Sequence, residues 1–187
     1  MAGVRLLRRQ DRVTRPWKNS GGVTQNIAVF PEGASDADFL WRTSLATIAD
    51  AGPFSPFSGV DRAFLLLRGE LAIAIGDQAE QHIRPGAPTL LFGGEETVNA
   101  CPVGGNCKAL NIMTRRGQVS ARVGRWTSTE ATAANALLLF ALETVAIEVG
   151  EERLALAPDD ALLLNDPDDL SSIEGTVIAA EFFYFAA

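Results

Sequence analysis

"LLLRGELAIAIGD", residues 65–77, has a second copy further along the chain, "LFALETVAIEVGE" at residues 139–151. The second copy begins 74 positions after the first and carries the same residue at several aligned positions. The identical pairs are Leu65/Leu139, Ala72/Ala146, Ile73/Ile147 and Gly76/Gly150. Self-similarity of this kind indicates a structural unit that occurs twice, although the period is too long for a solenoid.

A second pair of stretches continues the repeat. "IRPGAPTLLF", residues 83–92, aligns with "LAPDDALLLN", residues 156–165, at an offset of 73, and Pro85 is aligned with Pro158. Each copy therefore predicts a strand, a turn, a strand, a tight turn with proline and an apolar strand. This order resembles the cupin fold, a small jelly-roll-like β-barrel.

Two copies in one chain predict an all-β bicupin, that is, two fused jelly-roll-like β-barrels. We expect residues 1–126 to form the first cupin barrel. Residues 127–187 should form a second, closely fused cupin-like barrel that is completed by strands of the N-terminal part. "TSTEATAAN", residues 127–135, is the candidate connection. Because such a barrel can enclose a small ligand, we expect the functional site inside one of them.

The composition limits the partners that we expect. The 187 residues suit one compact domain or two small fused ones, and 47% of them are hydrophobic. The formal charge of -7 disfavours nucleic acid, because phosphate contacts need a concentrated basic face. No stretch approaches a membrane span, and the first residues lack the apolar segment of a signal peptide. We therefore expect a cytoplasmic protein with reduced cysteines that binds neither nucleic acid nor membrane.

Several stretches predict individual elements. "FLWRTSLATI", residues 39–48, alternates as a strand does, and "DAGPFSPFSG", residues 50–59, predicts an ordered loop that holds aromatic side chains. "AFLLLRGELAIAIGD", residues 63–77, predicts two short strands of a β-hairpin with the turn at Gly69. Residues 136–150 fit a helix or a strand by composition, and the repeat favours the strand.

The sequence excludes several kinds of catalytic site. His82 is the single histidine, so the His-rich metal centre of catalytic cupins cannot form, and we predict neither a metal nor another cofactor. "NSGG" does not fit the G-x-S-x-G turn, and Ser20 as a nucleophile would need His82 as its base. Lys18 precedes the glycines, which reverses the P-loop order. These observations disfavour an enzyme without excluding one.

Polar residues recur on single faces of the expected strands. Arg42 and Ser44 share one face of the strand at 39–48, and Asn111 and Met113 share one face of a later strand. In a barrel one face points inward, and an inward arginine must be paired or must meet an anion. A surface position or an internal salt bridge is the alternative for each of these charges.

Three ordered segments resemble the HutD/Ves family of bicupins: "PWKNSGGVTQNI" (16–27), "DFLWRTSLATIADAGPFSPFSGVDR" (38–62) and "LNIMTRRG" (110–117). The resemblance is dense over residues 4–117 and weak beyond. It implies a cytoplasmic bacterial protein that is encoded with histidine-utilisation genes and limits the pathway. A metabolite such as urocanate or N-formylglutamate is the implied ligand, and no established catalytic activity comes with the resemblance.

Two positions depart from the family pattern. Ser20 stands where the family has glycine, which puts the backbone bend in question because only glycine takes a positive φ freely. Asn26 stands at an acidic position and removes a carboxylate.

The resemblance places a ligand site on this chain. Arginine binds carboxylate bidentately, while Asn, Ser and Thr can hold the remaining polar atoms and Phe or Met can supply apolar walls. The ligand-binding residues predicted in this way are Asn19, Thr24, Arg42, Ser44, Phe54, Asp61, Arg62, Asn111 and Met113.

Three hypotheses follow for the function. The first is a regulatory protein that binds a small carboxylated metabolite. The second is a metal-independent enzyme acting on a small carboxylate, with Arg42 or Arg62 for binding and the adjacent Asp61 as base. The third is a protein that acts through a partner surface, with a vestigial cavity. An exposed sheet edge would also be compatible with a homodimer.

Overall fold

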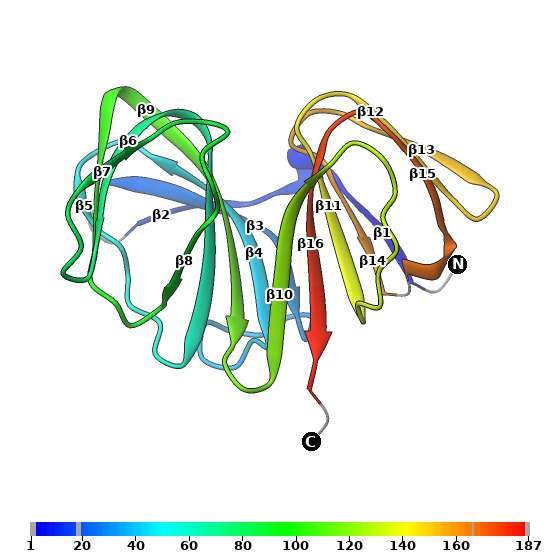
Figure 1. Ribbon diagram of the computed structural model, residues 1–187, viewed down its shortest axis with the longest axis horizontal. Helices are drawn as coiled ribbons and strands as arrows, with labels where there is room; N and C mark the ends of the chain where they lie inside the picture. Colours follow the sequence, from blue (N-terminus) through cyan, green and yellow to red (C-terminus); the bar gives the residue numbers. More distant parts are fainter. Residues whose placement is uncertain (1–2, 18–19, 166, 186–187) are drawn as a thin grey trace. The chain divides into compact units, whose positions relative to one another are not determined.

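A computed structural model of the chain describes residues 3–17, 20–165 and 167–185 (Figure 1). Strands dominate the described residues, which confirms the predicted all-β class, whereas two closed barrels remain a prediction. Within the described part, no helix has the length and hydropathy that a membrane crossing requires. The chain divides into two compact units, Val13–Arg116 and Met1–Arg12 with Gly117–Ala187, which we call the N-terminal and C-terminal units.

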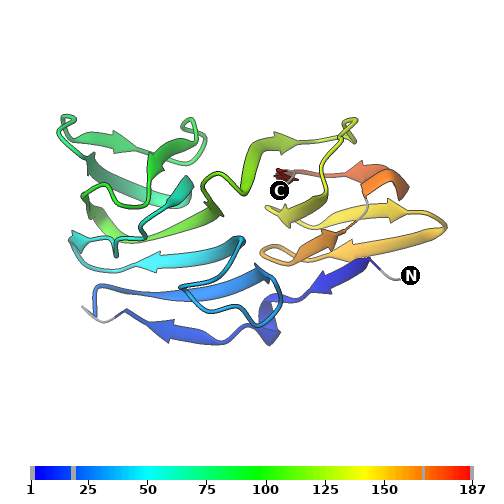
Figure 2. The ribbon, with the colours of Figure 1, turned by 90° about the horizontal axis from the view of Figure 1, so that it is seen from below.

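The N-terminal unit is built on one antiparallel sheet. Its strands follow the order β2-β3-β4-β9-β6-β7, β5 pairs with β9, and β8 pairs with β6. Figure 2 shows β2 and β3 in blue beside β4 in cyan. The strands are β2 (Thr14–Pro16), β3 (Gly22–Phe30), β4 (Trp41–Ile48), β5 (Gly52–Pro53), β6 (Val60–Ile75), β7 (Gln81–Ile83), β8 (Leu90–Gly93) and β9 (Val98–Arg115).

The predicted hairpin at Gly69 is wrong, because residues 60–75 form one long strand, β6. Its pairing with β9 shifts register on both sides of Arg68, so β6 bends there as a β-bulge instead of turning back. Gly69 has a φ of +86°, and an added Cβ would lie 2.9 Å from the Sγ of Cys107. Before the bulge the even-numbered residues of β6 face the cluster, and after it the odd-numbered residues do. Phe64 and Ile73 therefore pack in the same cluster.

One apolar cluster of this unit lies on one face of the sheet, which we call the clustered face. Even-numbered residues of β4 and the first half of β6 lie on it, together with odd-numbered residues of the second half of β9. The buried residues of this cluster are Ile48, Phe64, Leu66, Leu71, Ile73, Ile75, Ile83, Phe92, Val98, Ala100, Cys107 and Ala109.

The C-terminal unit contains two antiparallel sheets, of order β1-β14-β11-β16-β10 and β13-β12-β15. Its strands are β1 (Val4–Leu7), β10 (Val119–Trp126), β11 (Ala136–Ala141), β12 (Val145–Val149), β13 (Glu152–Leu156), β14 (Ala161–Leu164), β15 (Leu170–Glu174) and β16 (Val177–Tyr184). Two 3-10 helices among its described residues are η1 (Arg9–Asp11) and η2 (Pro167–Asp169). β1 pairs with β14, so the first residues of the chain contribute a strand to this unit.

The division between the units falls earlier than the sequence suggested. It lies at Arg116/Gly117 and at Arg12/Val13, not after residue 126. Residues 127–135 join β10 to β11 inside the C-terminal unit. β10 therefore completes the C-terminal unit, where it pairs with β16.

The internal repeat is visible in the backbone. Gly76 and its counterpart Gly150 have φ values of +55° and +58°. In the proline turns, Gly86 and its counterpart Asp159 have φ values of +92° and +71°. Both copies thus place left-handed residues at equivalent turns, and residues 136–150 form two strands, as the repeat predicted.

Candidate functional site

Polar side chains from neighbouring strands meet in one row of the N-terminal sheet. Ser44 on β4 pairs with Asn26 on β3 and with Asn111 on β9, and Asn111 also pairs with Phe64 on β6. Residues directly opposite in antiparallel strands share a face. Because Phe64 belongs to the cluster, this polar row lies on the clustered face.

The next row brings two arginines to the same face. Arg42 on β4 pairs with Met113 on β9, and Met113 pairs with Arg62 on β6. Met113 is buried between them, at 1% exposure. We call Asn26, Arg42, Ser44, Arg62 and Asn111 the polar patch.

Arg62 is buried among phenylalanine rings. It is 7% exposed, and its Cζ lies 5.2, 5.9 and 5.1 Å from the ring centroids of Phe54, Phe57 and Phe92. The amides of Phe54 and Phe57 bond to carbonyls outside the loop, at 2.9 and 2.7 Å, which confirms the predicted ordered aromatic loop. Rings at these distances interact favourably with a cation and keep water from it.

The charge of Arg62 has no carboxylate partner among the described residues. Its Nε donates to Oδ1 of Asn111 at 3.3 Å and its Nη1 donates to the carbonyl of Ser55 at 3.4 Å, so both hydrogen bonds are long and both acceptors neutral. Burial, and to a smaller extent the charge of Arg42, lower the pKa of Arg62 to about 10. Arg62 is therefore still positively charged at neutral pH.

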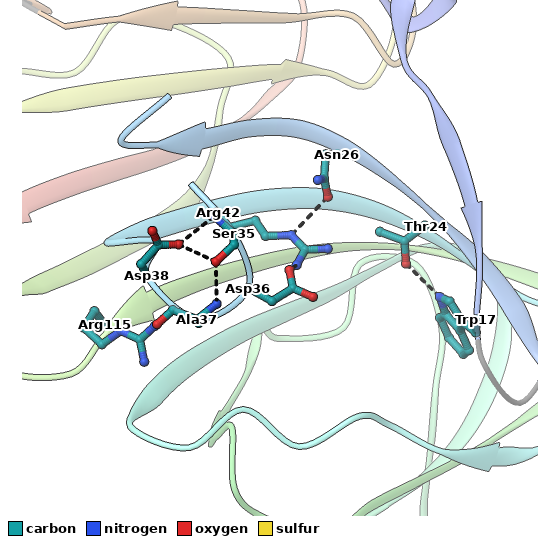
Figure 3. Close-up of polar contacts among 9 residues, drawn as sticks. All are labelled: Trp17, Thr24, Asn26, Ser35, Asp36, Ala37, Asp38, Arg42 and Arg115. Carbon is teal, nitrogen blue, oxygen red and sulfur yellow. Dashed lines mark hydrogen bonds and ion pairs between the residues drawn. The ribbon is translucent and has the colours of Figure 1, made fainter. Parts of the chain in front are cut away.

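Arg42 lies nearer the surface and is partnered (Figure 3). Its Nε donates to Oδ1 of Asn26 at 3.0 Å, and its Nη1 forms an ion pair with Asp36. The side chain of Arg42 is 13% exposed, whereas that of Asp36 is 73% exposed. Burial lowers the pKa of Arg42, and the Asp36 carboxylate opposes that shift.

The loop that carries Asp36 is held by other contacts. Oδ1 of Asp38 accepts from the amide and the hydroxyl of Ser35, both at 2.6 Å. Nη2 of Arg115 donates to the carbonyl of Ala37 at 3.0 Å (Figure 3). Asp36 thus projects from a braced turn.

Thr24 lies on the clustered face, but its hydroxyl is engaged in a hydrogen bond with Trp17. Its Oγ1 accepts from Nε1 of Trp17 at 2.7 Å, and the Trp17 ring meets Phe54 edge-on at a centroid distance of 6.2 Å. Ser20 itself adopts a φ of +59°, so the bend that the family pattern assigns to glycine is made here by serine. Gly22, two residues after Ser20, is required for close packing, since an added Cβ would collide with the carbonyl of Thr47.

The structure does not bring every predicted residue to the patch. Asp61 precedes Arg62 on β6 and points to the opposite face, because successive strand residues alternate. Its side chain is 55% exposed and accepts from Nε of Arg116 at 2.7 Å. Asp61 therefore cannot act as a base on the patch, and Asn19 lies outside the described residues.

Sequence reasoning missed Asn26 and Asp36. Asn26 lies two residues after Thr24 on β3, so the spacing alone predicts that both side chains share a face. The bulge that begins after Asn26 ends this regular alternation. Asp36 lies in a loop, where no periodicity signals the direction of a side chain.

Metal-binding groups are not assembled in the part of the chain that the structure describes, where no three His, Cys, Asp or Glu side chains gather. His82 is exposed and its Nδ1 lies 3.0 Å from Oε1 of Glu70. An open depression of about 260 Å³ is lined by Ala51, Gly52, Glu80, Asn99, Ala100 and Cys101. It includes no residue of the polar patch.

Comparison with known proteins identifies relatives over nearly the whole chain. A family model described as HutD matches residues 9–180. An uncharacterized 21.2 kDa protein in the hutC 3' region of Pseudomonas putida is 33% identical over 181 residues, which covers 93% of each chain. Protein Ves of Citrobacter koseri is 39% identical over 108 residues, 57% of this chain and 56% of Ves.

Solved structures agree with the fold. HutD from Pseudomonas fluorescens SBW25 matches with a TM-score of 0.86 at 24% identity, over 98% of this chain and 100% of that one. A cupin 2 conserved barrel domain protein from Leptotrichia buccalis matches with a TM-score of 0.58 at 12% identity, over 92% of each chain. The fold is therefore cupin-like.

Proposed function

The chain belongs to the HutD/Ves family, and from this premise we propose that it is a bicupin that limits histidine utilisation in the cytoplasm by binding a small carboxylated metabolite. The ligand would be of the urocanate or N-formylglutamate type. The polar patch of the N-terminal unit is the proposed site.

One observation carries the proposal: Arg62 is a buried cation without a carboxylate partner among the described residues. Removing an ion from water costs several kcal/mol, of which a neutral amide and a carbonyl recover only part. A ligand carboxylate could bind the guanidinium through two parallel hydrogen bonds. The surrounding Phe54, Phe57 and Phe92 rings would strengthen that contact by excluding water.

The groups on the patch favour binding over catalysis. Ser44, Asn26 and Asn111 are neutral, and both arginines stay protonated at neutral pH. The carboxylate that contacts the patch belongs to Asp36 and is already paired with Arg42. An enzyme acting on a carboxylate would need a general base here, and Asp61 faces away.

Calorimetric titration of the purified protein with urocanate and N-formylglutamate tests the proposal. We expect binding of at least one acid, and we expect Arg62→Gln to weaken it by about 100-fold, the effect of removing one partner from a buried charged pair. Arg68→Gln is the matched control, because Arg68 lies on the same strand and is exposed. Histidine consumption by cells that express either variant then tests the regulatory role.

The proposal fails if no small carboxylate produces heat or a thermal shift with the wild-type protein. It also fails if Arg62→Gln and Arg68→Gln bind the acid equally well. A binding loss without any change in histidine consumption would overturn the regulatory part alone.

A further inference from the structure

Strand β8 of the N-terminal unit is paired on one side only. Among the described residues it pairs with β6, and no strand pairs with its other edge. Its counterpart in the internal repeat is β14, which is paired on both sides, with β11 and with β1 (Figure 1). The edge that β1 covers in the C-terminal unit is therefore uncovered in the N-terminal unit, as far as the described part of the chain extends.

The backbone groups of Leu91 point out of this uncovered edge. The amide of Gly94 donates to the carbonyl of Val60 at 2.6 Å, so Gly94 points toward β6. Successive residues of an antiparallel strand bond to alternate sides, and Gly93 accordingly donates to Oε1 of Glu96 in its own turn, at 2.7 Å. The same alternation directs the N–H and C=O of Leu91 away from β6, where no described residue bonds to them.

The side chains of this edge are suited to pairing with another strand. Leu91 is 76% exposed, more than any other large hydrophobic residue that the structure describes, while Leu90 and Phe92 beside it pack in the cluster of the N-terminal unit. Edge strands usually carry a charge or a proline that prevents pairing with another chain. Residues 89–94 contain neither. The edge of β8 thus lacks the usual protection.

We propose that this edge binds the same edge of a second copy of the chain, with the two β8 strands antiparallel about a two-fold axis at Leu91. The contact between β1 and β14 shows what an equivalent edge accepts, since it is antiparallel and places Val4 opposite Leu164. In the proposed pair, Leu91 lies opposite Leu91 of the second copy, and the two residues exchange both N–H···O bonds. Two N-terminal sheets are then joined into one.

The charges that flank β8 favour this antiparallel arrangement. The side chain of Arg84, before the strand, is 75% exposed, and that of Glu95, after it, is 47% exposed. The amide of Ala87 donates to the carbonyl of Arg84 at 3.0 Å, so a turn brings these two residues close together. With the axis at Leu91, Glu95 approaches Ala87 of the second copy and hence the Arg84 of that copy. A parallel pairing would place like charges together instead.

The contact is short, so we expect a weak dimer. A stable interface buries about 1,600 Å² in total, and the edge of a four-residue strand covers much less. The dimer should therefore form in concentrated solution and dissociate on dilution. Sedimentation velocity over a concentration series measures its dissociation constant. Over the same series, the protection of the Leu91 amide against hydrogen exchange should rise.

Substitutions at Leu91 test both parts of the contact. Leu91→Lys should weaken association by at least about tenfold, because an apolar contact is lost and two ammonium groups face each other at the axis. Val13→Lys is the matched control: Val13 is 70% exposed, precedes β2 and receives the same charge, so this variant should associate as the wild type does. Leu91→Pro removes the outward N–H without removing a bond to β6, and it should weaken association by a similar factor.

A wild-type protein that stays monomeric throughout the series overturns the proposal, and an edge that is covered by a different protein gives that same result. A dimer that persists in both Leu91 variants also overturns it, because the copies then meet elsewhere. If Leu91→Lys weakens the dimer while a folded Leu91→Pro does not, the strand pairing is wrong. Leu91→Lys changes an exposed side chain, so the test remains decisive even if Leu91→Pro unfolds.

Discussion

The most deeply buried charged side chains of the two units have different partners. In the C-terminal unit, Glu181 is 1% exposed and Arg122 pairs with both of its oxygens, while Asp160 is 2% exposed and accepts from Nη1 of Arg8 at 2.8 Å. In the N-terminal unit, Arg62 meets neutral acceptors and aromatic rings. A paired buried charge stabilises the fold, whereas an unpaired buried charge lowers its stability. This contrast supports the proposal that the N-terminal unit binds a ligand at Arg62.

The apolar clusters of the two units also differ. The cluster of the C-terminal unit consists of apolar residues, among them Leu137, Leu139, Ile147 and Val177. The clustered face of the N-terminal unit changes from apolar residues to the polar patch along β4 and β9. A face that interrupts its own core in this way gives up hydrophobic stabilisation, which is expected where a site is built.

The largest effect should come from breaking the paired charge of the C-terminal unit. Arg122→Met leaves the 2% exposed Glu181 side chain without its charged partner, and we therefore expect the free energy of unfolding to fall. Urea unfolding at neutral pH measures it. Arg125→Met, which changes another exposed arginine of the same strand, is the control and should change stability by less than about 0.5 kcal/mol.

Adding Glu181→Leu to Arg122→Met should restore most of that stability, because two apolar side chains then replace the ion pair. A double variant as unstable as the single one would show that Arg122 stabilises through packing instead of charge.

The opposite sign is expected for the N-terminal unit. Arg62→Met removes a buried cation that lacks a carboxylate partner, so we expect the ligand-free protein to keep its stability or gain about 1 to 2 kcal/mol. The same urea unfolding measures this, beside the loss of carboxylate binding. A loss of more than about 2 kcal/mol would mean that Arg62 holds the fold, and the contrast between the units would disappear.

A smaller effect is expected at Asp160. Its carboxylate accepts from the amide of Arg9 at 2.8 Å and from Arg8, so Asp160→Asn should cost about 1 kcal/mol at neutral pH. Burial raises the pKa of Asp160, but hydrogen bonds from the Arg9 amide and Arg8 outweigh it and the pKa is lowered.

The sign of the pH dependence follows from this lowered pKa. A carboxyl group whose pKa is lower in the folded state stabilises the protein above the unfolded pKa of about 3.9 and loses that contribution as the pH falls through the folded value. The difference between wild type and Asp160→Asn should therefore be constant from pH 5 to 8 and shrink below about pH 4. A difference that grew in acid would contradict the assignment.

The repeat predicted the turns of the fold but not its strand registers. The aligned Leu65 and Leu139 are identical, yet Leu139 lies in the C-terminal cluster while Leu65 lies off the clustered face. The first copy continues through the bulge at Arg68 as one strand, whereas the second copy is divided into β11 and β12 at the equivalent position. Gly69 signals both a bulge and a hairpin, so the sequence could not decide between them.

The part of the candidate site that lies on a single strand could be predicted from the alternation of side chains along that strand. Arg42 and Ser44 were placed on one face from their spacing in β4. That Asn111 and Arg62 join them depends on the pairing of β4, β9 and β6, which are far apart in sequence. Long-range register is set by the whole core, so local patterns do not reveal it.

The smallest expected effect tests the equivalence of the two proline turns. Gly86 has a φ of +92° where its counterpart Asp159 has +71°, and no atom lies within 4 Å of a Cβ added at Gly86. Gly86→Ala should therefore cost about 1 kcal/mol through backbone strain alone. Gly86→Asp should cost less than Gly86→Ala, because aspartate tolerates the left-handed conformation better and the other copy of the repeat already uses it. Thermal unfolding of the two variants ranks them, and equal losses would indicate that the turns share sequence without sharing the conformational requirement.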